Sequence, residues 1–542
     1  MKKPVYSPYQ TAGGRRMKDL TSSVYCFEDL IQGNFLYVDK TESIWQLIRP
    51  AKAAYFLSRP RRFGKSLTLS TLKAVFEGKK ELFKGLAIND KPYDWKKHPV
   101  IHLDMNGRDF SSEEKMEQSF RQILMEQAEI NGVELQETTS DTMFHRLIKT
   151  LHDRDGDVVI LLDEYDKPIL NNISKPNVSD FLSALKVFYS VIKEKSGMLR
   201  LAFITGVSKF CHVSLFSDLN NLTDITMDAR YATMLGYTQT EFESNFRDQI
   251  EAAEKGQLHS HRDFLAEIKK WYDGFRFEEN SETVYNPVSL ANFFEKGGKF
   301  NNYWFQTGTS TFLLELIMKS KFNYSGMFTD PVSESFFNAF EITRLKPMVL
   351  LFQSGYLTIK KYVDEKIPYT DQTIRKYYLD FPNLEVERSF NEQLLEYCTA
   401  IRSESSPDFF GKLITAVGSC DADGFIKLIQ SVFAGIPYPI QIKNEHYYQT
   451  VFYVICDLLR LMVQAEICTG NGRIDMMVAA GDWIYVIEFK LNKSADQAMR
   501  QIENKDYAVK FRKEGKRIML LGVNFDSGAG NITDWIKEEY CG

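Results

Sequence analysis

The segment from residue 53 to residue 78 constrains the fold more than any other part of the chain. It begins with a short apolar run, AAYFL, continues through SRPRRFGKS, and ends in a stretch whose apolar residues recur at helical spacing. This order predicts a strand, a tight loop and a helix. Such loops hold phosphates with backbone N–H groups, while a lysine reaches the outer phosphates and the next hydroxyl ligates Mg²⁺. Gly64, Lys65 and Ser66 occupy those positions.

The phosphate loop departs from the common GxxxxGK[ST] pattern at one position. Arg59 stands where the first glycine is expected, and Pro60 follows it. A GKS triplet alone is weak evidence, because it occurs by chance in many proteins of this length. The loop residues assigned to ATP binding are Arg62, Phe63, Gly64, Lys65, Ser66 and Leu67.

A second nucleotide motif lies in DVVILLDEYDKPI, where an apolar strand ends in Asp163 and Glu164. In P-loop ATPases the first acid after such a strand holds the Mg²⁺ shell, and the next can activate water. Asp163 is therefore assigned to ATP and, with Ser66, to the metal, and Glu164 is assigned to catalysis. The alternative is a buried strand that runs into an acidic turn.

A third strand is predicted in LRLAFITGV at 199–207, followed by Ser208 and Lys209. A strand between the two nucleotide motifs would deliver Thr205, Ser208 and Lys209 toward the γ-phosphate as sensors. A strand-end turn built around Gly206 explains the same residues without any role in ATP binding.

The C-terminal part predicts an α-β-β-β-α-β order. A helix at 441–462 precedes strands at about 463–468, 473–479 and 483–490, a polar helix and a strand at 517–523. Asp475 lies on the second strand, and Glu488 and Lys490 share one face of the third because they are two residues apart.

These three residues suit phosphodiester hydrolysis, which needs carboxylates to hold Mg²⁺ and a cation to orient water. Asp475, Glu488 and Lys490 are predicted to be catalytic, with Asp475 and Glu488 as metal ligands. Glu466 could add a further acid, and Gln501 could orient the site. The alternative is an ordinary half-buried hairpin whose Glu and Lys are solvated partners.

The middle of the chain, from about 245 to 400, is rich in aromatic residues that are mostly expected in the core. Segments 357–363 and 375–381 predict two strands after an apolar helix at 343–353, an order that is similar to a winged-helix unit. Such units bind DNA in some proteins and only pack against an ATPase core in others.

Four sequence blocks together resemble the bacterial family called AAA-ATPase-like. They are YVDKT at 37–41, RPRRFGKSL at 59–67, LLDEYDKP at 161–168, and TGVSKF with SLFSDLNNLTDIT within 205–226. The family also has RPRRFGKS, so the resemblance makes the missing glycine an expected feature. It implies ATP binding through Gly64, Lys65 and Ser66, with Asp163 and Glu164 at the metal and the water.

Four further blocks resemble the PD-(D/E)xK nuclease domain that commonly follows AAA-ATPase-like modules. They are NEHYYQTVFYVI at 444–455, GRIDMMV at 472–478, VIEFKLNKSADQAMRQI at 486–502 and KDY at 505–507. The signature residues Asp475, Glu488 and Lys490 are all present, so the resemblance implies an active copy.

The length of 542 residues exceeds what one hydrophobic core supports, which is about 250 to 300 residues. We expect an α/β protein with three domains. They are a P-loop NTPase-like parallel-sheet domain at 1–245, a mostly helical middle region with a winged-helix-like unit at 246–410, and a restriction-endonuclease-like α/β domain at 411–542.

The expected cofactors are ATP and Mg²⁺, and the expected partner is nucleic acid, DNA more than RNA. The net charge of -5 provides no global attraction to DNA. Residues 489–517, however, carry nine Lys or Arg against four Asp or Glu, which could meet a phosphate backbone. A homo-oligomer is compatible with this interpretation.

Compartment signals favour the cytoplasm. The seven cysteines form no CxxC pair and are odd in number, which fits a reduced setting. The most hydrophobic helix candidate, at 451–463, is short and carries Asp457 and Arg460, so no membrane span is expected.

The preferred interpretation is an ATP-dependent or ATP-gated DNA nuclease, in which nucleotide changes access to the C-terminal site. One alternative is a nucleotide-sensing regulator or scaffold that binds nucleic acid or a partner without cleavage. Another is an ATPase helper of a mobile element, which would show DNA-stimulated turnover without cleavage.

Overall fold

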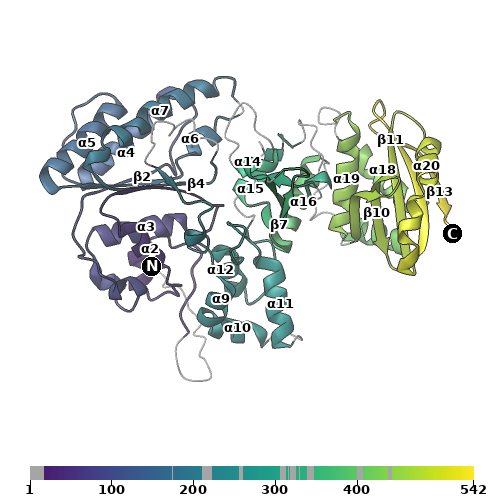
Figure 1. Cartoon of the computed structure of the whole chain (residues 1–542), viewed down its shortest axis with the longest axis horizontal. Coiled ribbons are helices and arrows are strands. Elements are labelled where there is room, and N and C mark those ends of the chain that lie inside the picture. The colour runs from purple at the N-terminus through teal and green to yellow at the C-terminus, as the bar shows by residue number, and fades with distance from the viewer. Residues whose placement is uncertain are drawn as a thin grey trace, which may run out of the picture. The chain divides into compact units, whose positions relative to one another are not determined.

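The computed structural model of the chain is shown in Figure 1. It describes residues 17–173, 175–209, 222–255, 260–304, 313–314, 316–317, 325–328, 330–337, 347–370, 372–398, 407–436, 442–459 and 461–541. One compact unit comprises residues 1–306, 333–364 and 381–385, and the other comprises 307–332, 365–380 and 386–542. Within the described ranges, no helix has both the length and the apolar character needed to cross a membrane.

The first unit is built on a five-stranded parallel sheet with the order β2-β3-β4-β1-β5. The strands are β1 (Ala53–Ser58), β2 (Val100–Asp104), β3 (Val158–Asp163), β4 (Leu199–Gly206) and β5 (Thr223–Asp224). Every residue of β3 is buried, because a parallel sheet covered on both faces needs continuous apolar strands. Strand β4 lies between β1 and β3, as the sequence predicts.

Helices cover both faces of this sheet (Figure 1). On one face lie α4 (Glu113–Ile130), α5 (Ser140–Asp155), α6 (Lys167–Leu170) and α7 (Val178–Glu194), and on the other lie α2 (Thr41–Ile48) and α3 (Lys65–Phe76), with α1 (Phe27–Gln32) packed on α3. In α4, Ser112 caps the first turn, and Met116, Phe120 and Ile123 bury one face at helical spacing. The helices thereby exclude water from the sheet.

A helical region follows the sheet within the same unit. It consists of α9 (Gln239–Asn245), α10 (Arg247–Glu254), α11 (His261–Tyr272) and α12 (Pro287–Glu295). Its core is mainly aromatic and includes Phe242, Phe246, Phe264, Trp271, Tyr272, Tyr285 and Phe293. The expectation that most aromatic residues of the middle region are core holds for this part.

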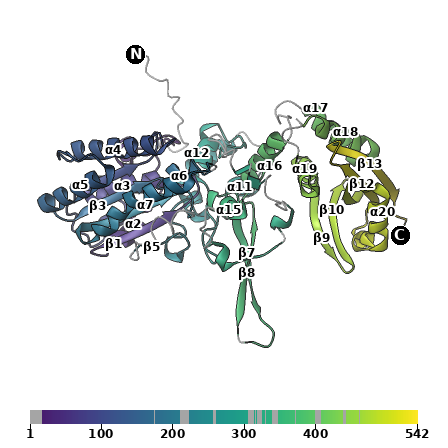
Figure 2. The ribbon, with the colours of Figure 1, turned by 90° about the horizontal axis from the view of Figure 1, so that it is seen from above.

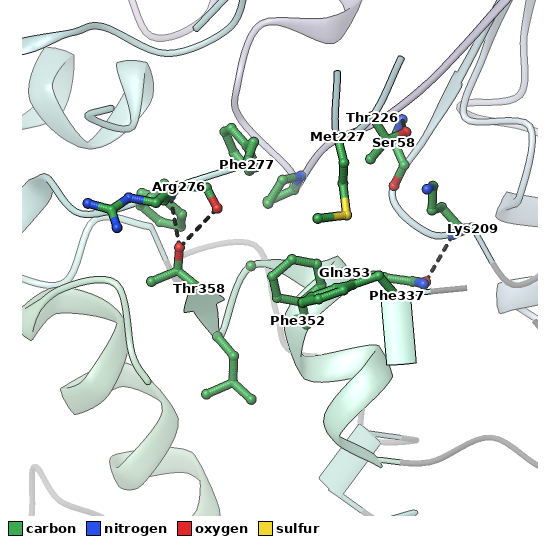
Figure 3. Close-up of a pocket in the computed structure, with 14 residues that line it drawn as sticks. Ser58, Lys209, Thr226, Met227, Arg276, Phe277, Phe337, Phe352, Gln353 and Thr358 are labelled. Atoms are coloured by element: carbon green, nitrogen blue, oxygen red, sulfur yellow. Dashed lines mark hydrogen bonds between the residues drawn. The ribbon is translucent and has the colours of Figure 1, made fainter. Parts of the chain in front are cut away.

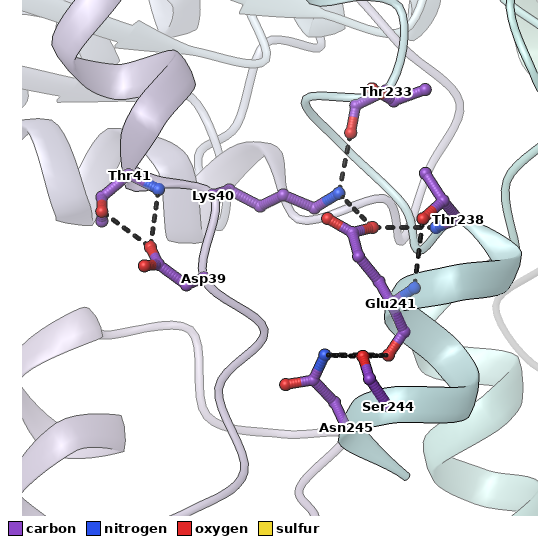
Figure 4. Close-up of polar contacts among 8 residues, drawn as sticks. All are labelled: Asp39, Lys40, Thr41, Thr233, Thr238, Glu241, Ser244 and Asn245. Carbon is purple, nitrogen blue, oxygen red and sulfur yellow. Dashed lines mark hydrogen bonds and ion pairs between the residues drawn. The ribbon is translucent and has the colours of Figure 1, made fainter. Parts of the chain in front are cut away.

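The YVDKT block joins the N-terminal segment to this helical region (Figure 4). Lys40 Nζ donates to the Thr233 carbonyl oxygen at 2.8 Å and lies 2.6 Å from Glu241 Oε2. Glu241 also forms a capping box with Thr238 at the start of α9. Asp39 accepts hydrogen bonds from the Thr41 amide and hydroxyl at 2.8 and 2.7 Å. Asp39, Lys40 and Thr41 of this block therefore stabilise the fold through these hydrogen bonds.

The predicted winged-helix elements are present in part. Helix α15 (Pro347–Ser354) precedes β7 (Thr358–Lys366) and β8 (Thr373–Asp380), while residues 343–346 of the predicted helix lie outside the described residues. Short elements before them are β6 (Val332–Ser333) and α14 (Glu334–Phe337). A role of this segment in DNA contact stays a prediction.

The second unit carries the predicted α-β-β-β-α-β order and one strand more. Helices α16 (Leu384–Cys398), α17 (Pro407–Gly418) and α18 (Ala422–Ala434) come first, followed by α19 (Glu445–Leu458), β9 (Met462–Thr469), β10 (Gly472–Ala480), β11 (Trp483–Leu491), α20 (Ala495–Asn504), β12 (Arg517–Asp526) and β13 (Asn531–Glu539).

The sheet of the second unit has the order β13-β12-β11-β10-β9, and its strands lie side by side in Figure 2. Only β11 and β12 are parallel among these described strands, since α20 provides the crossover that a parallel pair needs. Val486 and Ile484 pack with Met499 and Ile502 of α20 in one core. Edge strand β13 is mostly exposed and charged. Because its sequence lacks the apolar alternation of a half-buried strand, the sequence did not predict it.

Two candidate active sites

The phosphate loop has the backbone that its sequence requires. Gly64 precedes α3 with a φ of 91°, a left-handed conformation that favours glycine, and Arg62 has a φ of 68°. Lys65 begins α3 and is buried, and its Nζ donates to the carbonyl oxygens of Arg59 and Pro60 at 3.0 Å each. Burial lowers the pKa of Lys65, and the nearby Asp163 charge opposes this effect. The ammonium is thus held inside the loop.

Arg59 explains how the loop forms without its first glycine. Its backbone is not among those with positive φ, so a side chain causes no strain there. Its buried guanidinium donates to the carbonyl oxygen of Thr226 at 2.6 Å and stacks over the Phe277 ring at 4.1 Å. The arginine therefore serves as a structural anchor between β1 and the segment after β5.

Ser66 and Asp163 meet although 97 residues separate them. Ser66 Oγ donates to Asp163 Oδ2 at 2.6 Å. Burial raises the pKa of Asp163 to about 6, while the Ser66 hydrogen bond and the Lys65 charge act against this rise. These two oxygen ligands fit Mg²⁺, which proteins bind through a few oxygens together with water and phosphate.

Glu164 follows Asp163 in a strained conformation, with a φ of 50°. Its backbone N–H donates to Asp163 Oδ1 at 3.0 Å, and its Oε2 lies 3.4 Å from Lys167 Nζ. The two consecutive acids therefore have different partners.

The remaining loop residues contribute in different ways. Phe63 is buried, and its ring packs edge-on against Phe275 and Phe277. Arg62 donates to the Tyr303 carbonyl oxygen at 3.1 Å, and Leu67 is half-buried in α3. The side chains of Phe63 and Arg62 thus contact other protein groups. Only the backbone N–H groups of these two residues are left to contact a phosphate.

The polar residues at the end of β4 have structural partners. Thr205 Oγ1 donates to the Leu57 carbonyl oxygen at 2.8 Å, Ser208 Oγ to Asp166 Oδ2 at 2.6 Å, and Lys209 Nζ lies 2.6 Å from Asp224 Oδ2. A Cβ at Gly206 would lie 2.5 Å from Asp166 Oδ1, so the chain needs glycine there. These contacts favour the strand-end turn over the sensor interpretation.

A pocket lies beside the phosphate loop (Figure 3). Its walls are largely apolar and include Pro60, Met227, Phe275 and Phe352, with the Gln353 amide accepting a hydrogen bond from Lys209 N at 2.9 Å. Its described lining contains none of the residues assigned to ATP from the sequence. The pocket is therefore separate from the predicted phosphate-binding groups.

The second candidate site lies in the C-terminal sheet. Strands β10 and β11 pair with Met476 opposite Ile487, so the next position sets Asp475 opposite Glu488. Asp475 Oδ2 accepts a hydrogen bond from Phe489 N at 2.8 Å, and Lys490 Nζ donates to Glu488 Oε1 at 2.8 Å. The structure brings together all three residues that the sequence assigned to this site.

Electrostatics at this site disfavour two negative charges. Burial and the neighbouring Glu488 carboxylate raise the pKa of Asp475. Burial also raises the pKa of Glu488, although the hydrogen bond from Lys490 opposes this. Glu488 is 1% exposed, and its Oε2 has no hydrogen-bond partner among the residues that the structure describes. A divalent cation would satisfy this oxygen and neutralise the pair.

The donor set fits Mg²⁺ with two protein carboxylates. Across the described part of the chain, no cluster of three or more His, Cys, Asp or Glu residues could hold a metal. Mg²⁺ sites often use only one or two carboxylates and complete their shell with water and substrate phosphate. Asp475 and Glu488 would be those ligands.

Three further polar residues of this unit, Glu445, Glu466 and Gln501, differ in whether their contacts connect them to the site. Glu445, at the start of α19, raises the pKa of both Asp475 and Glu488 through its charge, so it lies near the site. Sequence analysis missed it, and its place in the NEHYYQ block was the available signal. Glu466 instead forms an ion pair with Arg473, and Gln501 donates to the Tyr507 hydroxyl at 3.4 Å. These contacts give no support to the roles suggested for Glu466 and Gln501.

Asp475→Asn should stabilise the metal-free protein at pH 8. A carboxyl whose pKa is raised by folding stabilises the protein at low pH, and this contribution is lost as pH rises from the unfolded-state pKa through the folded-state pKa. Above both values, each tenfold difference in proton affinity between the two states costs about 1.4 kcal/mol. The variant should unfold at a higher temperature than wild type in EDTA at pH 8, with the gain shrinking toward pH 5. An equal gain at both pH values would contradict this cause.

Comparisons with known proteins follow the same division of the chain. Residues 22–216 match the family model described as "Predicted AAA-ATPase", and residues 443–535 match that of the PD-(D/E)XK nuclease superfamily. Over 537 residues the chain is 36% identical to an uncharacterized protein in the vnfD 5′ region of Azotobacter chroococcum mcd 1, covering 96% of this chain and 99% of that one.

Two solved structures show weaker similarity. The Aeropyrum pernix ORC2 protein in ADPNP-ADP complexes matches with a TM-score of 0.30 and 12% identity, covering 65% of this chain and 89% of that one. Cdc6p from Pyrobaculum aerophilum matches with a TM-score of 0.26 and 13% identity, covering 68% and 93%. Both TM-scores are too low to indicate a shared overall fold.

Proposed function

The chain belongs to the AAA-ATPase-like family and ends in a PD-(D/E)XK nuclease superfamily domain, and from this premise we propose that it binds and hydrolyses ATP and cleaves DNA with Mg²⁺. ATP would act in the first unit and change access to the nuclease site. The observation that carries the proposal is the meeting of Asp475, Glu488 and Lys490, with a Glu488 oxygen that lacks a hydrogen-bond partner in the described part of the chain.

The nuclease residues have distinct roles in this proposal. Mg²⁺ held by Asp475 and Glu488 would supply positive charge to the scissile phosphate. Lys490 lies beside Glu488 and can donate a hydrogen bond to a water that attacks phosphorus. As the water oxygen bonds to phosphorus its proton would pass to solvent, and the bond from phosphorus to the leaving oxygen would break. The leaving oxygen would take the electron pair of that bond, and the metal charge would offset it until solvent supplies a proton. Glu445 adds a third carboxylate near these residues.

The ATP residues support hydrolysis as well as binding. Lys65 would contact the outer phosphates, Ser66 and Asp163 would hold Mg²⁺, and Glu164 would orient and activate the attacking water. The hydrogen bond between Ser66 and Asp163, 2.6 Å long, joins the two proposed ligands.

DNA is the proposed partner because basic side chains follow the catalytic strand. Lys493, Arg500 and Lys505 lie on or beside α20, within the segment of positive excess. Counterion release from such contacts would make binding fall steeply with salt. We also propose a cytoplasmic setting, in line with the free thiols of the five cysteines whose side chains are described, and a homo-oligomer, which sedimentation of the purified protein would test.

Purified full-length protein tests the function directly. Incubated with plasmid DNA, single-stranded DNA or RNA, it should cleave DNA when Mg²⁺ or Mn²⁺ is present and stop when EDTA is added, with ATP changing the rate. Metal-independent cleavage would contradict the proposed centre. ATP binding without cleavage of any substrate would favour a scaffold, and DNA-stimulated ATP turnover without cleavage would favour a mobile-element helper.

A further inference from the structure

The phosphate loop carries four cationic side chains, and three of them are already bound to protein groups. Arg59 and Arg62 each donate to backbone carbonyl oxygens elsewhere in the first unit. Lys65 donates to two carbonyl oxygens within the loop itself. The fourth cation, Arg61, is exposed and has no hydrogen bond or ion pair among the residues that the structure describes. Its guanidinium is therefore available to a ligand.

Arg61 lies beside the ammonium that is expected to reach the outer phosphates. Lys65 Nζ donates to the Pro60 carbonyl oxygen at 3.0 Å, and the carbon of this carbonyl group is bonded to the Arg61 nitrogen. Standard bond lengths place the Arg61 Cα within about 7 Å of the Lys65 ammonium. Burial lowers the pKa of Lys65 and of Arg62, and the nearby Arg61 charge lowers both further. The three cations therefore lie close together.

No described acid forms an ion pair with Arg61 to offset this repulsion. Asp163 accepts a hydrogen bond from a serine of α3, Glu164 pairs with a lysine of α6, and Asp166 accepts from a serine after β4. A cation held beside two like charges is destabilised until an anion joins them. The outer phosphates of ATP are such an anion, because Lys65 is expected to contact them in the same loop.

We propose that Arg61 contacts the outer phosphate of ATP and stabilises the negative charge that develops during hydrolysis. The inference rests on the proposed ATPase function and adds a catalytic residue to it. As the water oxygen bonds to the γ-phosphorus, the bond from phosphorus to the β,γ-bridging oxygen breaks, and ADP keeps the electron pair. The water proton passes to Glu164. The Arg61 guanidinium donates hydrogen bonds to the oxygens that gain charge, and its planar fork can donate two at once.

The charge comes from the same chain that binds the phosphates. Some nucleotide hydrolases receive such an arginine from a second protein, and others carry it within the same chain. Arg61 belongs to the phosphate loop itself, so it is present at every bound ATP. Mixing Arg61→Ala protein with Lys65→Ala protein, which keeps Arg61 but should bind ATP weakly, should therefore not restore turnover.

The test compares ATP turnover with binding of a transition-state analogue in full-length variants. Arg61→Ala should lower kcat roughly 100- to 1000-fold, as expected for loss of one preorganised charge-stabilising group. ADP with Mg²⁺ and aluminium fluoride mimics the phosphoryl group in transfer, and Arg61→Ala should bind this complex about 100-fold more weakly than wild type. ADP alone should bind within about threefold of wild type, because it lacks the outer phosphate.

Two further variants test the chemistry of the side chain. Arg61→Lys keeps the charge without the planar fork and should recover only part of the lost rate. Arg121→Ala is the matched control, since it removes an exposed arginine of α4 outside the phosphate loop. It should change neither kcat nor binding of the analogue.

Each outcome bears on the role of Arg61. Turnover by Arg61→Ala at the wild-type rate overturns it and leaves the proposed ATPase function standing. An equal loss of ADP and analogue binding also overturns it, because Arg61 would then only shape the loop. Turnover restored in the mixture overturns supply from the same chain. If wild type binds ATP without hydrolysing it, both this inference and the proposed hydrolysis fail.

Discussion

Glu488→Gln should remove most of the metal-dependent DNA cleavage while the protein remains folded. The substitution keeps the size of a side chain that is 1% exposed but removes the charge that would hold the cation. Loss of one preorganised charge-stabilising group costs roughly 100- to 1000-fold in rate. Asp475→Asn and Lys490→Met should fall in the same range, because Asp475 is the second ligand and Lys490 the cation that orients water.

The three nuclease residues act as one unit, so their losses should not add. The double variant Asp475→Asn with Glu488→Gln should be little slower than either single variant. Glu538→Gln is the control, since it changes an exposed acid on the edge strand β13. Initial rates of plasmid nicking measure the effect, with thermal unfolding to verify folding. Cleavage by folded Glu488→Gln at the wild-type rate would mean that the active site lies elsewhere.

Lys65→Ala and Glu164→Gln should separate ATP binding from ATP turnover. Lys65 is buried within the loop, and a charge-assisted phosphate contact contributes roughly 1.5 to 3 kcal/mol, so its loss should weaken ATP binding about 10- to 100-fold. Glu164→Gln should bind ATP normally and hydrolyse it roughly 100-fold more slowly, because only the water-activating group is lost.

Calorimetry with ATP and Mg²⁺ measures the affinities, and phosphate release measures turnover. Lys84→Ala removes an exposed lysine of the same unit and should change neither quantity. Unchanged affinity in Lys65→Ala would reject the phosphate loop as the binding site. Equal hydrolysis by wild type and Glu164→Gln would remove the assignment of Glu164 alone.

Local motifs predicted the parts of both sites that depend on neighbouring residues. Gly64, Lys65 and Ser66 lie on one loop and helix start, and Glu488 and Lys490 lie on one strand, so spacing alone indicates their geometry. The sequence also predicted that Ser66 and Asp163 share a metal ion, because P-loop ATPases place the hydroxyl after the loop lysine and the acid at the end of the second motif's strand beside the same Mg²⁺. The family matches confirm the general interpretation of these motifs.

Contacts between distant residues could not be predicted in this way. Nothing in the sequence says that Lys167 reaches Asn106, or that Arg59 stacks on Phe277. Ser208 and Lys209 resembled sensors because polar residues at a strand end can face ligand or protein equally well. Their acceptors, Asp166 and Asp224, become known only when the strands are assembled.

The division of the chain into units limits how this protein can be recombined. The backbone passes from one unit to the other five times, the last time after residue 385, and the nuclease match at 443–535 lies wholly beyond that point. A gene fusion joined at residue 306 would remove residues 333–364 and 381–385 from the first unit and carry them into the C-terminal product. A recombination that joins this nuclease to a different ATPase is therefore simplest between residues 386 and 442. A junction there leaves the first unit whole and lies ahead of the nuclease match.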